Sequence, residues 1–76
     1  MTPSQCRAAR AFLDWPRREL AARTGLALLT VAKFESEETE PRDNTMQAIV
    51  DAFAFAGIEF FGGERPGLRF SGRKRL

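Results

Sequence analysis

Gly25 separates two short segments with helical patterning, and this arrangement constrains the chain more than any other feature of its sequence. The segment before it, expected to begin at Pro16 and to end near Thr24, carries Leu20 and Ala21 near its middle. Glycine adopts a left-handed turn at almost no cost, whereas other residues do not. The chain is therefore expected to end one helix at Gly25 and to change direction there.

The segment after the turn is expected to form a second short helix, over residues 27–36. Val31 and Phe34 are three positions apart and so lie on one face of it, while Leu26 can fill the turn. Ala21 is small at the point where two steeply crossing helices come closest. Two short helices joined by a tight turn form a helix-turn-helix, which presents its second helix to the major groove of DNA.

Two further helices flank this pair. The first is expected over residues 3–13, with Thr2 as its N-cap, and the other, capped by Asp43 or Asn44, is expected to end at Gly57. Apolar side chains recur in these segments at helical intervals. The side chains expected in the common core are Trp15, Leu20, Val31, Phe34, Met46, Ile49 and Phe53.

The pattern changes in the last quarter of the chain. Residues 58–61 and 68–71 are short, aromatic-rich and roughly alternating, with a glycine- and proline-containing stretch between them. This pattern predicts a β-hairpin. The chain is thus expected to divide into a helical domain over residues 1–57, the hairpin over residues 58–71, and a basic, disordered tail over residues 72–76.

Composition excludes several classes of protein. The 76 residues suffice for one small domain, and no apolar run approaches the ~20 residues that cross a bilayer. The N-terminus lacks the apolar stretch of a signal peptide, so a cytoplasmic protein is expected. One cysteine and no histidine argue against a disulfide, a metal site and most acid–base catalysis. We therefore expect no enzyme activity, no metal and no cofactor, and we expect Cys6 to be buried rather than reactive.

Charge is distributed unevenly along the chain, although the net charge is only +2. Residues 1–34 hold six basic and two acidic side chains, residues 35–64 hold one basic and eight acidic, and residues 65–76 hold five basic and none acidic. Nucleic-acid binding depends on a basic face rather than on total charge. The first segment is suited to a phosphate backbone, and the acidic middle is expected to face away from it.

The chain resembles the lambda-repressor-like helix-turn-helix domains, specifically the XRE type of bacterial and phage regulators. The resemblance covers roughly residues 4–57. It is carried by the first-helix stretch QCRAARAFLDW, by the Ala21–Gly25–Val31 triplet, by KFES, and by EPRDNTMQAIVDAF. It implies a mainly α, compact four-helix domain, here followed by the hairpin, that binds double-stranded DNA.

The resemblance also implies roles for individual residues. In this family the start of the motif's first helix contacts phosphate, and the start of its second helix reads base edges. The positions that correspond here are Arg17, Arg18, Ala27, Leu28, Leu29, Thr30, Ala32, Lys33 and Arg42, of which Leu28, Leu29, Ala32 and Lys33 would face bases and the others phosphate. The competing interpretation is a set of solvated surface charges, with Arg42 neutralising the neighbouring glutamates. Arg10 and Glu35 correspond instead to a structural ion pair between two helices.

Leu28 and Leu29 depart from the polar residues usual at base-reading positions. A leucine donates no hydrogen bond to a base, and at best packs on thymine methyl groups. Three interpretations stay open at this point: contact with methyl groups, reliance on DNA shape with weak sequence preference, or burial against a protein partner.

Phe55, Phe60, Phe61 and Phe70 exceed what so small a core can hide. Alternation along a strand places Phe60 and Phe61 on opposite faces, so at least one is expected to be exposed in a monomer. We therefore expect these four phenylalanines to form a homodimer interface, the competing interpretation being a monomer with one apolar edge. The function that follows is a dimeric, sequence-specific transcriptional regulator, most simply a repressor, on a palindromic operator. The alternative is a protein-interaction module or antitoxin-like subunit with the same fold.

Overall fold

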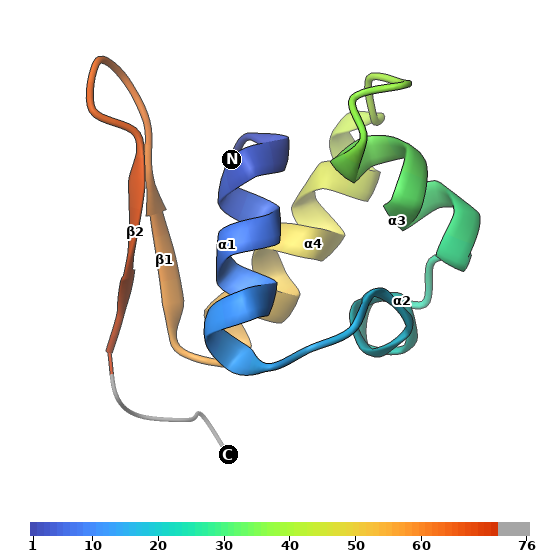
Figure 1. Cartoon of the computed structure of the whole chain (residues 1–76), viewed down its shortest axis with the longest axis horizontal. Helices are drawn as coiled ribbons and strands as arrows, with labels where there is room; N and C mark the ends of the chain where they lie inside the picture. The colour runs from blue at the N-terminus through green and yellow to red at the C-terminus, as the bar shows by residue number, and fades with distance from the viewer. Residues whose placement is uncertain (72–76) are drawn as a thin grey trace.

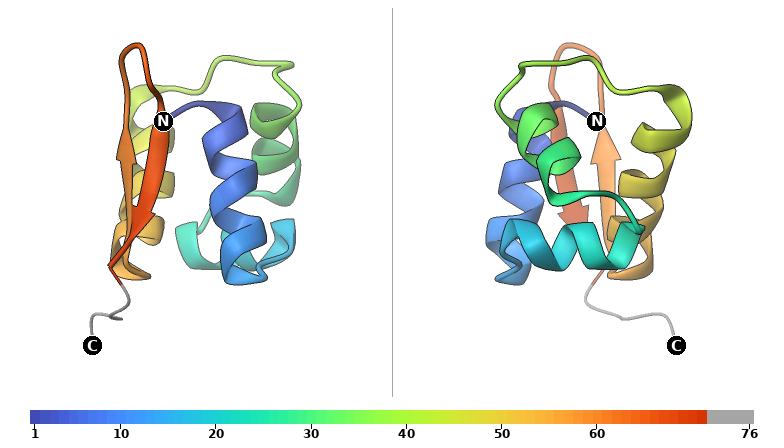
Figure 2. Two further views of the ribbon diagram at one scale, coloured as in Figure 1. Left: turned by 60° about the vertical axis from the view of Figure 1, so that its left-hand side comes forward. Right: turned by 90° about the vertical axis from the view of Figure 1, so that its right-hand side faces the viewer.

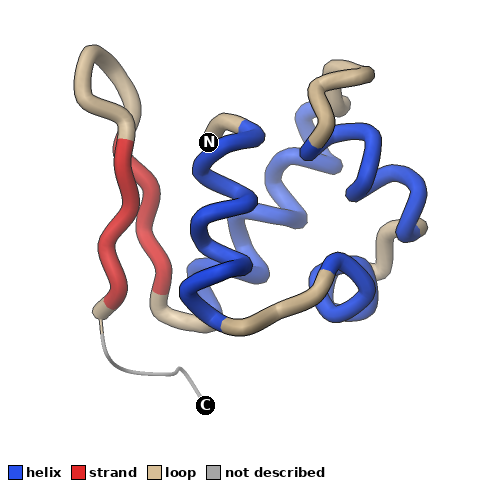
Figure 3. The backbone as a smooth tube through the Cα atoms, in the orientation of Figure 1, coloured by secondary structure: helices blue, strands red, loops and turns tan. Residues whose placement is uncertain are grey.

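Four helices followed by an antiparallel hairpin make up the fold, as seen in a computed structural model that describes residues 1–71 (Figures 1 and 3). The expected fold class is confirmed, while the tail over residues 72–76 lies outside the described residues. The elements are α1 (Pro3–Leu13), α2 (Arg17–Thr24), α3 (Leu28–Glu35), α4 (Asp43–Phe55), β1 (Ile58–Phe61) and β2 (Gly67–Phe70).

The core lies between α1 and α4, with α2 and α3 on one side of these helices and the hairpin on the other (Figure 1). Five of the seven predicted core residues are fully buried, whereas Trp15 and Met46 are only partly buried at the border. Trp15 stacks on Phe53, with 5.5 Å between ring centroids. The buried apolar side chains of the cluster are Cys6, Ala9, Leu20, Ala21, Val31, Phe34, Ile49, Phe53 and Ile58.

Three helices begin one residue away from the predicted position: α2 and α3 begin later, and α4 begins earlier. The N-caps are Pro16 for α2, Ala27 for α3 and Arg42 for α4, so the expectation that Asp43 or Asn44 caps α4 was wrong. None of these three residues caps its helix with a side-chain hydrogen bond. The first turns of these helices therefore keep backbone N–H groups without an intrahelical acceptor.

The start of α1 is capped in full and also holds the hairpin. Thr2 and Gln5 form a capping box, in which each side chain bonds the other residue's backbone N–H. The Gln5 side chain is buried, and its Nε2 donates to the carbonyl oxygens of Phe61 and Gly67, both at 2.6 Å. Phe61 and Gly67 pair at the loop end of the hairpin. One buried amide thus fixes the end of the hairpin to the first turn of α1.

The register of the hairpin places Phe60 and Phe70 on one face of the sheet and Phe61 on the other. Ile58 pairs with Phe70, and Phe60 pairs with Leu68. Ile58, Phe60 and Leu68 pack on the core, so these side chains face the helices. Residues that alternate with them face outward, and Phe61 is accordingly exposed.

Phe60 and Phe70, which share the inner face of the hairpin, both make aromatic contacts with the helices. Phe60 meets Phe53 edge-on at 5.5 Å, and Phe70 meets Phe12 of α1 at 4.9 Å between centroids. Strand β2 ends at Phe70, one residue earlier than predicted, and the backbone N–H of Ser71 donates to the Gly57 carbonyl at 2.8 Å just beyond the strand. Phe60 and Phe70 therefore lie on one face of the hairpin and Phe61 on the other, and the homodimer interface expected at these residues and Phe55 stays a prediction.

Replacing Gln5 by alanine is expected to destabilise the protein by about 1–3 kcal/mol, because two strand carbonyls would lose their buried donor. The measurement is urea unfolding followed by circular dichroism. Gln47→Ala is the matched control, since Gln47 is exposed and bonds only Asp51 one turn away on α4, and it should change stability by less than about 0.5 kcal/mol. Equal midpoints for the two variants would contradict the role given to Gln5.

Candidate nucleic-acid interface

The turn between α2 and α3 sets the direction in which α3 leaves α2. Gly25 ends α2 with a φ of 74°, and a Cβ added there would meet nothing within 4 Å. Glycine is thus required by the backbone conformation and not by lack of space. Thr24 Oγ1 donates to the carbonyl of Leu20 at 2.8 Å and accepts from the N–H of Leu26 at 3.3 Å. The right-hand view of Figure 2 shows α3 rising from this turn above α2.

Glu35, the last residue of α3, is the buried charge that joins the helices; it is 1% exposed. Arg10 binds it in a two-pronged manner: Nε donates to Oε2 at 2.6 Å and Nη2 donates to Oε1 at 2.7 Å. The third guanidinium nitrogen of Arg10 donates to the Trp15 carbonyl at 2.8 Å. The structure thus contains the ion pair that the family resemblance implied for these two residues.

Two further side chains, which the sequence reasoning did not assign to this cluster, also reach the Glu35 carboxylate. Cys6 Sγ donates to Oε2 at 3.1 Å, and Arg17 Nε donates to Oε1 at 3.1 Å. Arg7 donates to the Glu35 backbone carbonyl. No local sequence signal could have found the Cys6 contact, because the two residues are far apart in the chain and meet only through the packing of α1 on α3.

This environment changes the pKa of both buried groups. Burial by itself would raise the pKa of the Glu35 carboxyl, but the hydrogen bonds from Arg10, Cys6 and Arg17 outweigh it and hold that pKa below the ordinary value. The pKa of the Cys6 thiol is raised, mainly by burial and then by its hydrogen bond to Glu35. Cys6 therefore stays a neutral thiol, which is a poor nucleophile.

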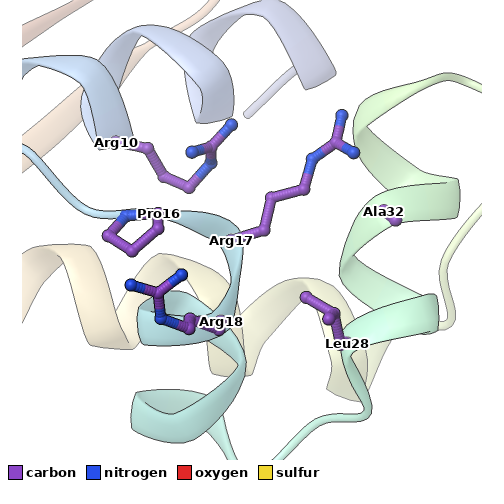
Figure 4. A pocket seen from close by; sticks show the side chains of 6 residues that line it. All are labelled: Arg10, Pro16, Arg17, Arg18, Leu28 and Ala32. Atoms are coloured by element: carbon purple, nitrogen blue, oxygen red, sulfur yellow. The ribbon is translucent and has the colours of Figure 1, made fainter.

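A pocket of about 500 Å³ lies between the starts of α2 and α3 (Figure 4). Arginine side chains from α1 and α2 extend toward it, and α3 contributes small and apolar side chains. Of the predicted DNA-contacting residues, the pocket brings together Arg17, Arg18, Leu28 and Ala32. It is completed by Arg10 and Pro16, which were not among them.

The remaining predicted positions lie around this pocket or away from it. Ala27, Leu29 and Thr30 are exposed at the start of α3, and Lys33 is half-buried one turn later. Leu28 is 50% exposed and Leu29 is 64% exposed. Arg42 is exposed but follows the loop at the far end of α3, so it does not line the pocket.

The arginines and the lysine differ in what they already bind. Within residues 1–71, no carboxylate lies within salt-bridge distance of Arg18, Lys33 or Arg42. Arg23, by contrast, binds Glu19 at 2.8 Å and lies over the Trp15 ring at 4.2 Å. Arg17 is intermediate, because its side chain is 44% exposed while one nitrogen holds Glu35. Arg18 and Arg17 are thus the cations that α2 offers to an anion.

The family model HTH_3, described as Helix-turn-helix, matches residues 7–59. The chain belongs to the lambda-repressor-like helix-turn-helix family. That family consists of DNA-binding regulators and is not typically enzymatic. No curated protein is similar enough to this helix-turn-helix chain to count as a match. The matched segment contains all four helices except the first residues of α1.

The described residues were also compared with the requirements of a membrane-spanning helix and of a metal site. None of the described helices has the length and apolar character needed to cross a membrane. Residues 1–71 contain no group of three or more side chains arranged to hold a metal ion.

The acid dependence of stability is expected to depend on Glu35. Because its folded-state pKa is lowered, the ionised carboxylate stabilises the fold above the ordinary carboxyl pKa of about 4.5, and this contribution is lost as the pH falls through the lower folded-state value. Glu35→Gln should destabilise the protein by about 3 kcal/mol or more at pH 7, because it leaves Arg10 without its buried partner. It should also flatten stability against pH below about 4.5.

The measurement is urea unfolding between pH 3 and pH 7 at low temperature. Glu40→Gln is the control, since Glu40 is exposed and makes no salt bridge within residues 1–71. If Glu35→Gln and the unmodified protein lose stability in parallel below pH 4.5, another carboxylate governs the acid transition.

Proposed function

We propose that the protein is a sequence-specific transcriptional regulator that binds a palindromic operator as a homodimer and represses by occupying the promoter. The single observation that carries the proposal is the meeting of unpaired and half-exposed cations with the exposed start of α3 around one pocket. The start of α3 enters the major groove, and the start of α2 lies on the phosphate backbone.

The ends of the helices support this orientation. Helices α2, α3 and α4 begin without side-chain caps, whereas α1 is fully capped. Backbone N–H groups and the positive end of the helix dipole favour a phosphate at such a start. Arg18 adds its charge at α2 and Arg42 at α4, so a backbone strand passing these helix starts meets donors and positive charge together.

The acidic residues are compatible with the same orientation. Glu37, Glu38 and Glu40 are exposed in the loop after α3, at the opposite end of that helix from Leu28 and Leu29 (Figure 1). A groove-bound α3 start keeps this negative loop away from the bases. Arg42, which follows the loop, brings a positive charge back toward the backbone.

The homodimer places its contact at the exposed aromatic residues. Phe12 and Phe70 pair at the edge where α1 meets β2, and both remain exposed. Phe55 and Phe61 add exposed rings on α4 and on the outer face of the hairpin. In this proposal residues 1–57 bind DNA, and residues 58–71 supply part of the dimer contact. Two recognition helices related by a two-fold axis would match half-sites about 34 Å apart.

One observation favours a second function. Leu28 and Leu29 are exposed apolar side chains at the position where the family reads bases, and exposed apolar surface often marks a protein contact. A protein-interaction module or antitoxin-like subunit would use this face against a partner protein. Salt dependence separates the two functions, because phosphate contacts weaken steeply with salt and an apolar contact does not.

The identifying experiment is a selection of genomic fragments retained by the purified protein at moderate salt. Recovery of one palindromic sequence, with the protein eluting as a dimer, supports the proposed regulator. Recovery of unrelated fragments, or of none, favours the leucine face as a protein-binding surface.

Removal of phosphate-contacting cations is expected to lower the salt dependence of DNA binding. Arg18→Ala and Arg42→Ala should each reduce the slope of log affinity against log salt concentration by about 0.9. The measurement is fluorescence anisotropy with a retained duplex between 50 and 300 mM KCl. Arg17 is left unchanged, because its loss would also disturb the Glu35 cluster.

Arg65→Ala is the matched control, since it removes the same charge from the hairpin loop at the other end of the molecule (Figure 1). A slope that falls equally for Arg65→Ala would assign the effect to net charge and overturn the assigned contacts.

A further inference from the structure

The first turn of α3 presents almost no hydrogen-bonding side chains to a groove. Ala27, Leu28 and Leu29 carry no polar side-chain atoms, and Thr30 alone adds a hydroxyl. Both leucines are at least half exposed, so they do not serve the core. A helix start with this composition makes its contacts through apolar packing.

The surroundings of the leucines indicate what kind of surface they meet. Leu28 lines the same pocket as Arg17 and Arg18, and its side chain extends from α3 toward α2 (Figure 4). The apolar patch is therefore bordered by positive charge. The complementary surface is apolar at its centre and anionic at its border, and a purely apolar protein surface would leave Arg18 unpaired.

The major groove of DNA has this character wherever a pyrimidine carries a C5-methyl group. The methyl group of thymine projects into the groove, and phosphates line both sides. Cytosine has only a hydrogen at the same place, whereas 5-methylcytosine carries the same methyl group. An apolar side chain distinguishes these bases by the area that it buries, and no hydrogen bond is required.

Resting on the proposed function, we infer that Leu28 and Leu29 recognise C5-methyl groups of pyrimidines in the major groove. Thymine supplies the methyl group in unmodified DNA, and 5-methylcytosine supplies it in methylated DNA. Arg17 and Arg18 hold the adjacent backbone, and this contact brings the two side chains to the groove floor. Each buried methyl group accounts for roughly a four-fold gain in affinity.

The test compares three versions of one DNA pool, made by amplifying a random 20-base-pair library after one round of retention by the protein. The first contains thymine and cytosine, the second uracil and cytosine, and the third uracil and 5-methylcytosine. We expect the second pool to bind about sixteen-fold more weakly than the first for each half-site, because it has no C5-methyl groups and two contacts of about four-fold each are lost. If the protein binds the third pool more tightly than the second, a methyl group on cytosine serves as well as one on thymine. If it binds the two pools equally weakly, recognition is restricted to thymine.

Variants assign the effect to the two leucines. The double variant Leu28→Ala, Leu29→Ala should bring the affinity ratio of the thymine and uracil pools close to one. Lys33→Ala should weaken binding to both pools and leave that ratio unchanged. Because both leucines are exposed, the double variant is expected to keep the circular dichroism spectrum of the unmodified protein.

The outcomes separate this inference from the function on which it rests. Equal binding of the thymine and uracil pools, with steep salt dependence, would overturn methyl recognition and leave DNA binding in place. An unchanged ratio in the double leucine variant would place the methyl contact on other residues. Failure to retain any pool would overturn the proposed function itself.

Discussion

The burial of one carboxylate, that of Glu35, is the constraint on which the rest of the structure depends. An ionised carboxylate removed from water is costly unless it is paired and hydrogen-bonded. Here the donors come from α1 through Arg10 and Cys6, and from α2 through Arg17, while Glu35 itself ends α3. The requirement that all these donors reach one group fixes how three short helices meet.

The Glu35 cluster, the anchor of α3, gives the two ends of this helix different roles. The C-terminal end is held by Glu35 and by the buried rings and methyl groups of Phe34 and Val31. The N-terminal end projects beyond the core with Leu28 and Leu29 exposed. A short helix can present a solvent-exposed first turn in a defined orientation because its other end is fixed. Arg17 links the two tasks, since it binds the anchor and lines the pocket.

The sequence predicted the features that depend on local periodicity. Helical spacing and the glycine at position 25 predicted α2, the turn and α3, and family resemblance implied the Arg10–Glu35 pair. The helix starts were predicted less well, because Pro16, Ala27 and Arg42 act as N-caps without the side-chain oxygen that marks a cap in sequence. The contacts of Gln5 and Cys6 could not be predicted, since they join residues brought together only by tertiary packing.

The placement of the phenylalanines also depends on tertiary packing that the sequence pattern does not reveal. Alternation correctly placed Phe60 and Phe61 on opposite faces, but which face met the helices depends on the hairpin register. That register places Phe70 on the side of Phe60 and against Phe12. Phe60 and Phe70 therefore share the inner face of the hairpin, whereas Phe61 lies on the outer face.

Cys6 can report when the Glu35 cluster opens, that is, when α1 separates from α3. It is the one cysteine in the sequence, it is completely buried, and its thiol is held neutral beside Glu35. A thiol reagent can reach it only when α1 separates from α3, so the rate of alkylation measures how often that interface opens. The native chain thus carries, where its helices meet, a thiol whose alkylation rate reports the opening of the α1–α3 interface, and no engineered probe is needed.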